Sequence, residues 1–142
     1  MSTARQILET WFYRVWAEED ATVIDELFIP DGKARGLGAN TLIGPDGYKQ
    51  FHSALLNLIS DCVISIDKTV EEDDWLAAVC TLRAKDRKTG APIMMTGTTT
   101  VRFADGKIVE AYNNWDFMGM FSQLGFLPSA TFELALSGEK IA

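Results

Sequence analysis

The feature that most constrains the fold is a change in hydrophobic period near residue 61. Before it, apolar residues recur at helical spacing, and after it they alternate with polar ones. The helical stripe of residues 4–19 consists of Ile7, Leu8, Trp11, Phe12, Val15 and Trp16. The alternating set of residues 75–85 consists of Leu76, Ala78, Cys80, Leu82 and Ala84. Helices followed by a run of strands predict an α+β domain with the helices on one face of a sheet.

Three helices are expected in the first part of the chain. The first covers residues 4–19, and Asp20 is placed to cap a short second helix that Pro30 ends. Residues 33–42 are dotted with glycine and predict a loop with one short edge strand. A third helix should begin at 44–47, with Pro45 in its first turn. Its apolar stripe contains Tyr48, Phe51, His52, Leu55, Leu56 and Ile59.

The second part predicts a four-stranded antiparallel meander. Its strands are expected at 62–67, 75–85, 92–103 and 107–116, separated by acidic and glycine-containing turns. Gly97 lies within the third of these strands and is interpreted as a place where the sheet bends. A short helix over 117–124 should end at Gly125. A bent sheet with helices over its hollow would form a cone around a pocket, the usual form of a small-molecule site.

Composition narrows the class of protein. At 142 residues, 47% of them apolar and 23% charged, residues 1–142 are expected to form a single globular domain. The net charge of −7 argues against nucleic-acid binding, and no apolar run or leader-like start suggests a membrane or exported protein, so the cytoplasm is expected. One histidine, two separated cysteines and no phosphate-binding loop predict neither a metal nor another cofactor.

Two segments carry a family resemblance. RQILETWFYRVWAEEDATVIDELFIPD (5–31) and FADGKIVEAYNNWDFMGMFSQLGFLP (103–128) resemble the opening and the ending of SnoaL-like polyketide cyclases and their ester cyclase relatives. These proteins belong to the nuclear-transport-factor-two-like superfamily. The resemblance implies a cystatin-like α+β barrel, a small hydrophobic or polyketide-like ligand, no cofactor and a homodimer. It also implies that Asp116 is the general acid/base of an intramolecular aldol closure.

The implied chemistry needs only a carboxylate in an apolar pocket, where desolvation raises the pKa so that it can take a proton from an acidic carbon. If Asp116 faces the cavity, strand alternation places Asn114 and Tyr112 on the same side as donors for the enolate. A helix-capping role for Asp116 is the other interpretation. The remaining pocket candidates, for which core packing is the alternative, are His52, Tyr48, Phe28, Trp11, Arg102 and Trp115. The side of the sheet on which Arg102 lies stays open.

Three functions remain as hypotheses. The first is a cofactor-independent lyase or isomerase of the polyketide cyclase type, performing proton transfer at carbon with cyclisation or isomerisation as the outcome. The second is a small-molecule-binding or accessory domain of the same fold without catalysis. The third is assembly, in which the outer face of the strand containing Thr98 and Thr100 pairs with another copy.

Overall fold

The structure is a computed structural model that describes residues 2–141. One six-stranded sheet has the strand order β2-β1-β6-β5-β4-β3. The strands are β1 (Phe28–Arg35), β2 (Leu42–Ile43), β3 (Ile59–Glu72), β4 (Trp75–Asp86), β5 (Pro92–Ala104) and β6 (Lys107–Trp115). The helices are α1 (Ala4–Thr10), the π-helix η1 (Trp11–Ala17), α2 (Thr22–Leu27), α3 (Gly44–Leu56), α4 (Phe117–Gln123) and α5 (Thr131–Leu136).

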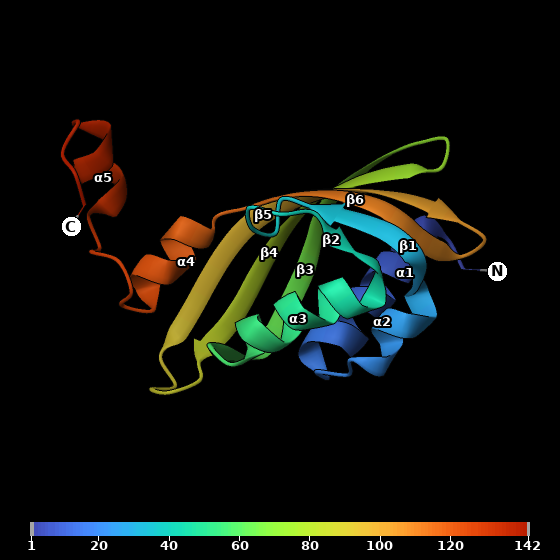
Figure 1. Cartoon of the computed structure of the whole chain (residues 1–142), viewed down its shortest axis with the longest axis horizontal. Coiled ribbons are helices and arrows are strands. Elements are labelled where there is room, and N and C mark those ends of the chain that lie inside the picture. The colour runs from blue at the N-terminus through green and yellow to red at the C-terminus, as the bar shows by residue number, and fades with distance from the viewer. Residues whose placement is uncertain (1, 142) are drawn as a thin grey trace.

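The sheet curves over the N-terminal helices without closing into a barrel (Figure 1). Helices α1, η1, α2 and α3 cover its concave face, and the apolar faces of helices and sheet meet there in one core. The antiparallel pairing of β3 with β4, β4 with β5 and β5 with β6 confirms the predicted meander. The predicted α+β class with a curved sheet is therefore confirmed.

The first helix changes type midway. Residues 4–10 are α-helical, with Thr3 as N-cap in a reciprocal bond pair with Gln6, but residues 11–17 form a π-helix. Its i→i+5 bonding brings residues five apart onto the same face. Trp11 and Trp16 are such a pair, and both are buried beneath the sheet. The single α-helix expected over residues 4–19 is corrected in this respect.

Strand β1 was not recognised correctly from the sequence. Residues 33–42 were expected to form a loop with a short edge strand. Residues 36–41 do form a loop and β2 is the edge strand, but residues 33–35 belong to β1, which lies inside the sheet and parallel to β6. Pro30, Asp31 and Gly32 interrupt its alternation, and its register with β6 shifts between Phe28 and Lys33. The irregular stretch hides the period-two pattern on which a strand prediction depends.

Gly97 makes room for a side chain of the neighbouring strand, and the bend expected there stays a prediction. It pairs with Trp115 across β5 and β6, and the indole ring of Trp115 lies directly over it. A Cβ atom at residue 97 would come within 2.7 Å of Trp115 Cγ and closer still to Cδ2. The missing side chain therefore provides the space in which Trp115 reaches the concave side of the sheet.

Candidate ligand cavity

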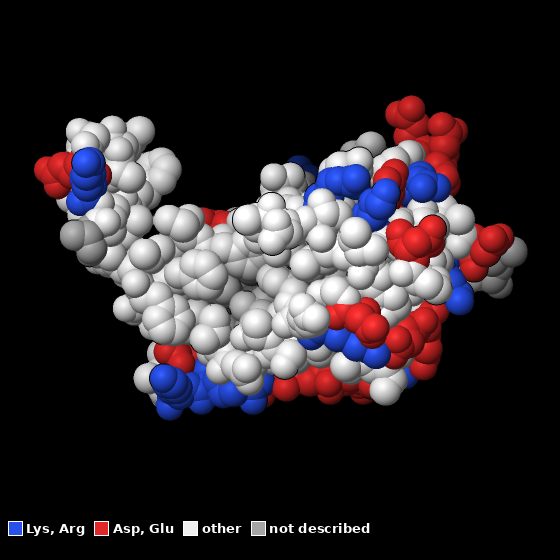
Figure 2. All heavy atoms as spheres, viewed as in Figure 1, with Lys and Arg blue, Asp and Glu red and all other residues white. Residues whose placement is uncertain are grey.

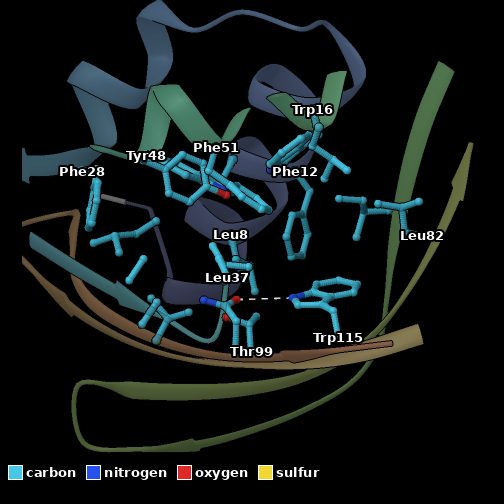
Figure 3. A pocket seen from close by; sticks show the side chains of 18 of the residues that line it. Leu8, Phe12, Trp16, Phe28, Leu37, Tyr48, Phe51, Leu82, Thr99 and Trp115 are labelled. Carbon is cyan, nitrogen blue, oxygen red and sulfur yellow. Dashed lines mark hydrogen bonds between the residues drawn. The ribbon is translucent and has the colours of Figure 1, made fainter. Parts of the chain in front are cut away.

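The sheet and the helices beneath it enclose a cavity of about 60 Å³ (Figure 3). A single water molecule needs roughly 10–15 Å³ of such space, so the cavity has more room than one water requires. Every layer of the fold contributes to its wall. The lining residues are Leu8, Trp11, Phe12, Trp16, Phe28, Ala34, Leu37, Tyr48, Phe51, Leu55, Ile64, Leu82, Met95, Thr99, Val101, Ile108, Ala111, Asn113, Trp115 and Phe117.

Aromatic rings form the helical side of the cavity around Tyr48. Its ring meets those of Trp11, Phe28, Trp16 and Phe51 edge to face, with centroid distances of 5.0, 6.0, 6.3 and 6.0 Å. Burial raises the pKa of Tyr48 to about 12. The phenol is therefore neutral near pH 7 and can act there as a hydrogen-bonding group, whereas a phenolate base would be almost absent.

Asn113, Thr99 and Trp115 supply the polar atoms on the sheet side of the wall. Asn113 of β6 donates from Nδ2 to the carbonyl oxygen of Arg35 at 3.1 Å, and its Oδ1 lies 3.4 Å from Trp115 Nε1 (Figure 3). Thr99 of β5 is buried beside them. Gly36, at φ +86°, lets the chain after β1 pass against the backbone of Asn113, where a Cβ would collide with its carbonyl. No residue of the wall carries a formal charge.

The cavity opens near the start of α4. Phe51 and Phe117 pack edge to face at 6.1 Å, and Phe117 stacks on Phe121 at 6.2 Å. Phe51, Trp115 and Phe117 are only half-buried, in contrast to the deeper residues around Tyr48. These three aromatic rings therefore form the rim through which a ligand would enter.

Asp116 lies at this rim and outside the wall. It is the exposed N-cap of α4, and its Oδ1 accepts a hydrogen bond from the backbone N–H of Gly119 at 3.0 Å. Its two neighbours in the chain, Trp115 and Phe117, both line the cavity. The carboxylate is thus close in sequence to the wall but hydrogen-bonded to the helix that follows it.

Tyr112 and Asn114 lie on the other face of the sheet, which corrects the expectation that they face the cavity. Both are exposed, and Tyr112 packs beneath the guanidinium of Arg35 at 5.2 Å. The two residues do share a face, as alternation requires, but the inward positions of β6 are Ala111, Asn113 and Trp115. The apolar residues at 111 and 115 were the sequence signal that could have identified Asn113 as the inward amide.

The other pocket candidates divide into two groups. Trp11, Phe28, Tyr48 and Trp115 lie in the cavity wall. Arg102 does not, because even-numbered residues of β5 face outward, and it bonds Glu110 through Nε at 3.1 Å and lies over the ring of Trp75.

His52 is buried but also lies outside the wall. Its Nε2 is 2.6 Å from the carbonyl oxygen of Val15, and its ring packs on Trp16 with centroids 4.8 Å apart. Because a carbonyl oxygen can only accept, Nε2 carries the proton in this contact. His52 therefore joins α3 to the π-helix, and the expectation that it lines the pocket is corrected.

Among residues 2–141, no group of three or more His, Cys, Asp or Glu side chains is arranged to hold a metal ion. Cys62 and Cys80 are free and buried, and burial raises their pKa values to about 12 and about 11. The same residues include no helix long and apolar enough to cross a membrane.

The comparisons with known proteins agree with this architecture. IdmH of Streptomyces antibioticus, a proposed polyketide cyclase, superposes with a TM-score of 0.74 and 21% identity, covering 87% of this chain and 99% of IdmH. A Catenulispora acidiphila protein with a ketosteroid-isomerase-like fold, bound to trimethylamine, superposes with a TM-score of 0.73 and 18% identity. The match covers 87% of this chain and 95% of that protein. AclR of Streptomyces galilaeus, a proposed hydroxylase, superposes with a TM-score of 0.70 and 22% identity. The match covers 85% of this chain and 93% of AclR.

Because these sequence identities are low, the superpositions show only that the fold is shared. A search of the curated proteins finds no match to the chain. The sequence model of the SnoaL-like domain matches residues 10–111, which span η1, α2, α3, most of the sheet and most of the cavity wall. The chain therefore belongs to the SnoaL-like domain family.

Proposed function

We propose that the cavity binds a small, uncharged, largely apolar molecule with a planar ring, such as a polyketide-like compound. The observation that carries this proposal is a wall without a charged side chain. A charged ligand would lose its hydration there without gaining an ion pair, which is costly, whereas an apolar ring gains from leaving water. Edge-to-face contacts with Trp11, Trp16 and Tyr48 suit a planar ring.

Asn113 and Thr99 would orient such a ligand. The amide of Asn113 has two N–H donors and two acceptor lone pairs, and its bonds to Arg35 and Trp115 use one of each. One donor and one lone pair remain for a ligand, and the hydroxyl of Thr99 lies on the same sheet face. A ligand carbonyl or hydroxyl group is the complementary chemistry.

Binding is tested by titrating the purified protein with planar aromatic ketones and with matched carboxylates, using tryptophan fluorescence and calorimetry. The ketones are expected to bind at least about tenfold more tightly, a difference of about 1.4 kcal/mol. Asn113→Leu should weaken ketone binding, while Asn114→Leu, on the outer face next to it, should leave it unchanged. Equal affinity for both ligand classes, or equal effects of the two variants, would contradict the proposal.

A second candidate function is proton transfer at carbon, giving a polyketide cyclase-like lyase or isomerase with Asp116 as acid/base. Its position between Trp115 and Phe117 favours this candidate, because a ligand in the cavity could present an acidic carbon at the rim. Tyr112 and Asn114 are left out of this mechanism, because they face away from the cavity.

Asp116→Asn separates the two candidates. Asparagine is as good an N-cap as aspartate, so the variant should fold with nearly unchanged stability while losing the base. If Asp116 is the acid/base, turnover of a ligand identified by titration falls at least about 100-fold and affinity stays the same. Full activity in the variant would exclude the role, and absence of turnover by the wild-type protein would leave the chain a binding domain.

Homodimerisation through the convex face of the sheet is proposed as well. This face carries Val79, Met94, Thr96, Thr98 and Thr100, all uncharged, which avoids repulsion between two acidic copies. Thr98→Arg should then lower the mass measured by light scattering to that of one chain. An unchanged mass would contradict the use of this face.

The cytoplasmic location stays a prediction, which fractionation of cells expressing the protein would test.

A further inference from the structure

Three of the aromatic side chains on the helical side of the cavity carry a polar atom. Trp11 and Trp16 each end in an indole N–H and Tyr48 in a hydroxyl, and all three residues line the cavity. Their exposed fractions are 5%, 4% and 7%, so each is more than nine-tenths buried. A polar atom in such surroundings costs free energy unless it has a hydrogen-bond partner. These atoms therefore constrain the chemistry of the ligand further than the rings alone.

The three polar atoms lie together around Tyr48. The ring centroids of Trp11 and Trp16 are 5.0 and 6.3 Å from that of Tyr48. Burial raises the pKa of Tyr48 to about 12, and hydrogen bonding by the two indole N–H groups lowers it by a smaller amount. Both indole nitrogens therefore face the hydroxyl oxygen. We call these three side chains the Tyr48 donor cluster.

Donors outnumber acceptors in the Tyr48 donor cluster. An indole N–H can only donate, whereas a phenol has one hydrogen to donate and one oxygen that accepts. The cluster therefore holds three donor hydrogens and a single acceptor atom. Among residues 2–141, the hydrogen-bond partners of the Tyr48 hydroxyl are the two indoles, neither of which can accept its hydrogen. That hydrogen is left for a ligand.

The sheet side of the cavity offers a second polar position. Figure 3 places Tyr48 on the helical side and Thr99 on the sheet side, with the cavity between them. Asn113, beside Thr99, keeps one amide N–H after its bond to the carbonyl oxygen of Arg35. Figure 2 shows mostly uncharged residues over α4 and the hollow beside it, so a ligand entering there meets little charge.

We propose that the Tyr48 hydroxyl donates to a carbonyl oxygen of the ligand, while Asn113 binds a second oxygen on the opposite edge of the same ring. This rests on the proposed binding of a neutral planar molecule and narrows it to ligands with oxygen atoms on two opposite edges. A ligand whose inner group can only donate would leave the hydrogen of Tyr48 without an acceptor, which is unfavourable in a buried site.

The test uses three ligands built on one benzene ring. Para-diacetylbenzene has carbonyl groups on two opposite edges, para-ethylacetophenone has one carbonyl group, and para-diethylbenzene has none. In calorimetric titrations the wild-type protein should bind the diketone roughly tenfold more tightly than the monoketone, because one more hydrogen bond forms. Tyr48→Phe keeps the ring and removes the hydroxyl, so it should weaken diketone binding roughly tenfold and abolish this preference.

Two controls separate the hydroxyl from the shape of the cavity. Para-diethylbenzene should bind equally to the wild-type protein and to Tyr48→Phe, because it offers no acceptor. Tyr13→Phe is the matched substitution, since Tyr13 is 62% exposed and lies outside the cavity wall, and it should leave diketone binding unchanged. A parallel loss of diethylbenzene binding in Tyr48→Phe would overturn the proposal, because the cost would then come from altered packing.

Infrared spectra of the bound diketone give a readout that does not depend on affinity. A hydrogen bond lowers the stretching frequency of a carbonyl group, so both carbonyl bands should be lowered in the wild-type complex and only one in Tyr48→Phe. Two lowered bands in the variant, or equal diketone affinity in both proteins, would overturn the proposal. If Asn113→Leu still weakens diketone binding in that case, the proposed function stands and only the role of Tyr48 fails. Equal binding of ketones and carboxylates would remove both.

Discussion

Replacing Gly97 by alanine is expected to destabilise the protein through a single contact. The new Cβ would lie 2.5 Å from Trp115 Cε3 and closer still to Cδ2, whereas ordinary contacts begin at 3.4 Å, so the indole must retreat by at least about 0.9 Å. Overpacking of this kind costs about 1–3 kcal/mol. Alanine also restricts the unfolded chain more than glycine does, which offsets about 0.4–1 kcal/mol. The free energy of unfolding should therefore fall by about 1–2 kcal/mol, which corresponds to a melting temperature lower by roughly 3–8 °C.

A double-mutant cycle with Trp115→Ala isolates the contact. Without the indole, the clash term disappears and only the effect on the unfolded chain remains, so Gly97→Ala should become neutral or stabilising in that background. The assay is denaturant unfolding of the four proteins, followed by far-UV circular dichroism. A coupling energy of about 1–3 kcal/mol is expected. Equal effects of Gly97→Ala in both backgrounds would refute the reasoning, because the cost would then come from the strand itself.

Three further predictions concern capping, the buried histidine and alkaline pH. Asp116→Ala should lower the free energy of unfolding by about 1 kcal/mol through loss of the cap on Gly119, measured by urea titration against Asp116→Asn, which should lose much less. His52→Leu should cost about 1–3 kcal/mol in the same assay, because the carbonyl of Val15 loses its partner inside the core. Stability should fall above pH 9: burial raises the pKa values of Cys62, Cys80 and Tyr48 from 9.0, 9.0 and 10.0 to about 12, 11 and 12, so only the unfolded chain ionises in this window. Urea titrations at pH 8 and pH 10.5 check the sign, and equal stability at the two values would contradict it.

Much of the fold could be predicted because its elements follow simple periods. The stripe from Ile7 to Trp16 marked the first helix, and alternation marked β4, β5 and β6 to within a few residues. The change to π-helix at Trp11 is not visible in the hydrophobic pattern of the sequence, because α and π turns place apolar residues at the same positions over so short a span. Strand β1 was missed since Pro30 and Gly32 interrupt its pattern, and its partner β6 is distant in sequence.

The site could be predicted in part. The aromatic candidates Trp11, Tyr48 and Trp115 do lie in the cavity wall, because large apolar side chains are usually buried. The polar candidates did not, because one residue of register decides the face of the sheet. Choosing Asp116 as the reference put Tyr112 and Asn114 inside, whereas the burial of Ala111 and the inward ring of Trp115 put Asn113 there.

The sequence by itself determined the class of the domain, the order of most of its elements and its family, since these depend on local periodicity and on residues close together in the chain. Only the tertiary structure decided which residues meet in the cavity. The uncharged cavity wall is assembled from residues far apart in sequence. The contacts of Trp115 with Gly97 and of His52 with Val15 also join distant residues. Such contacts depend on strand register and helix placement, which arise only when the whole chain packs.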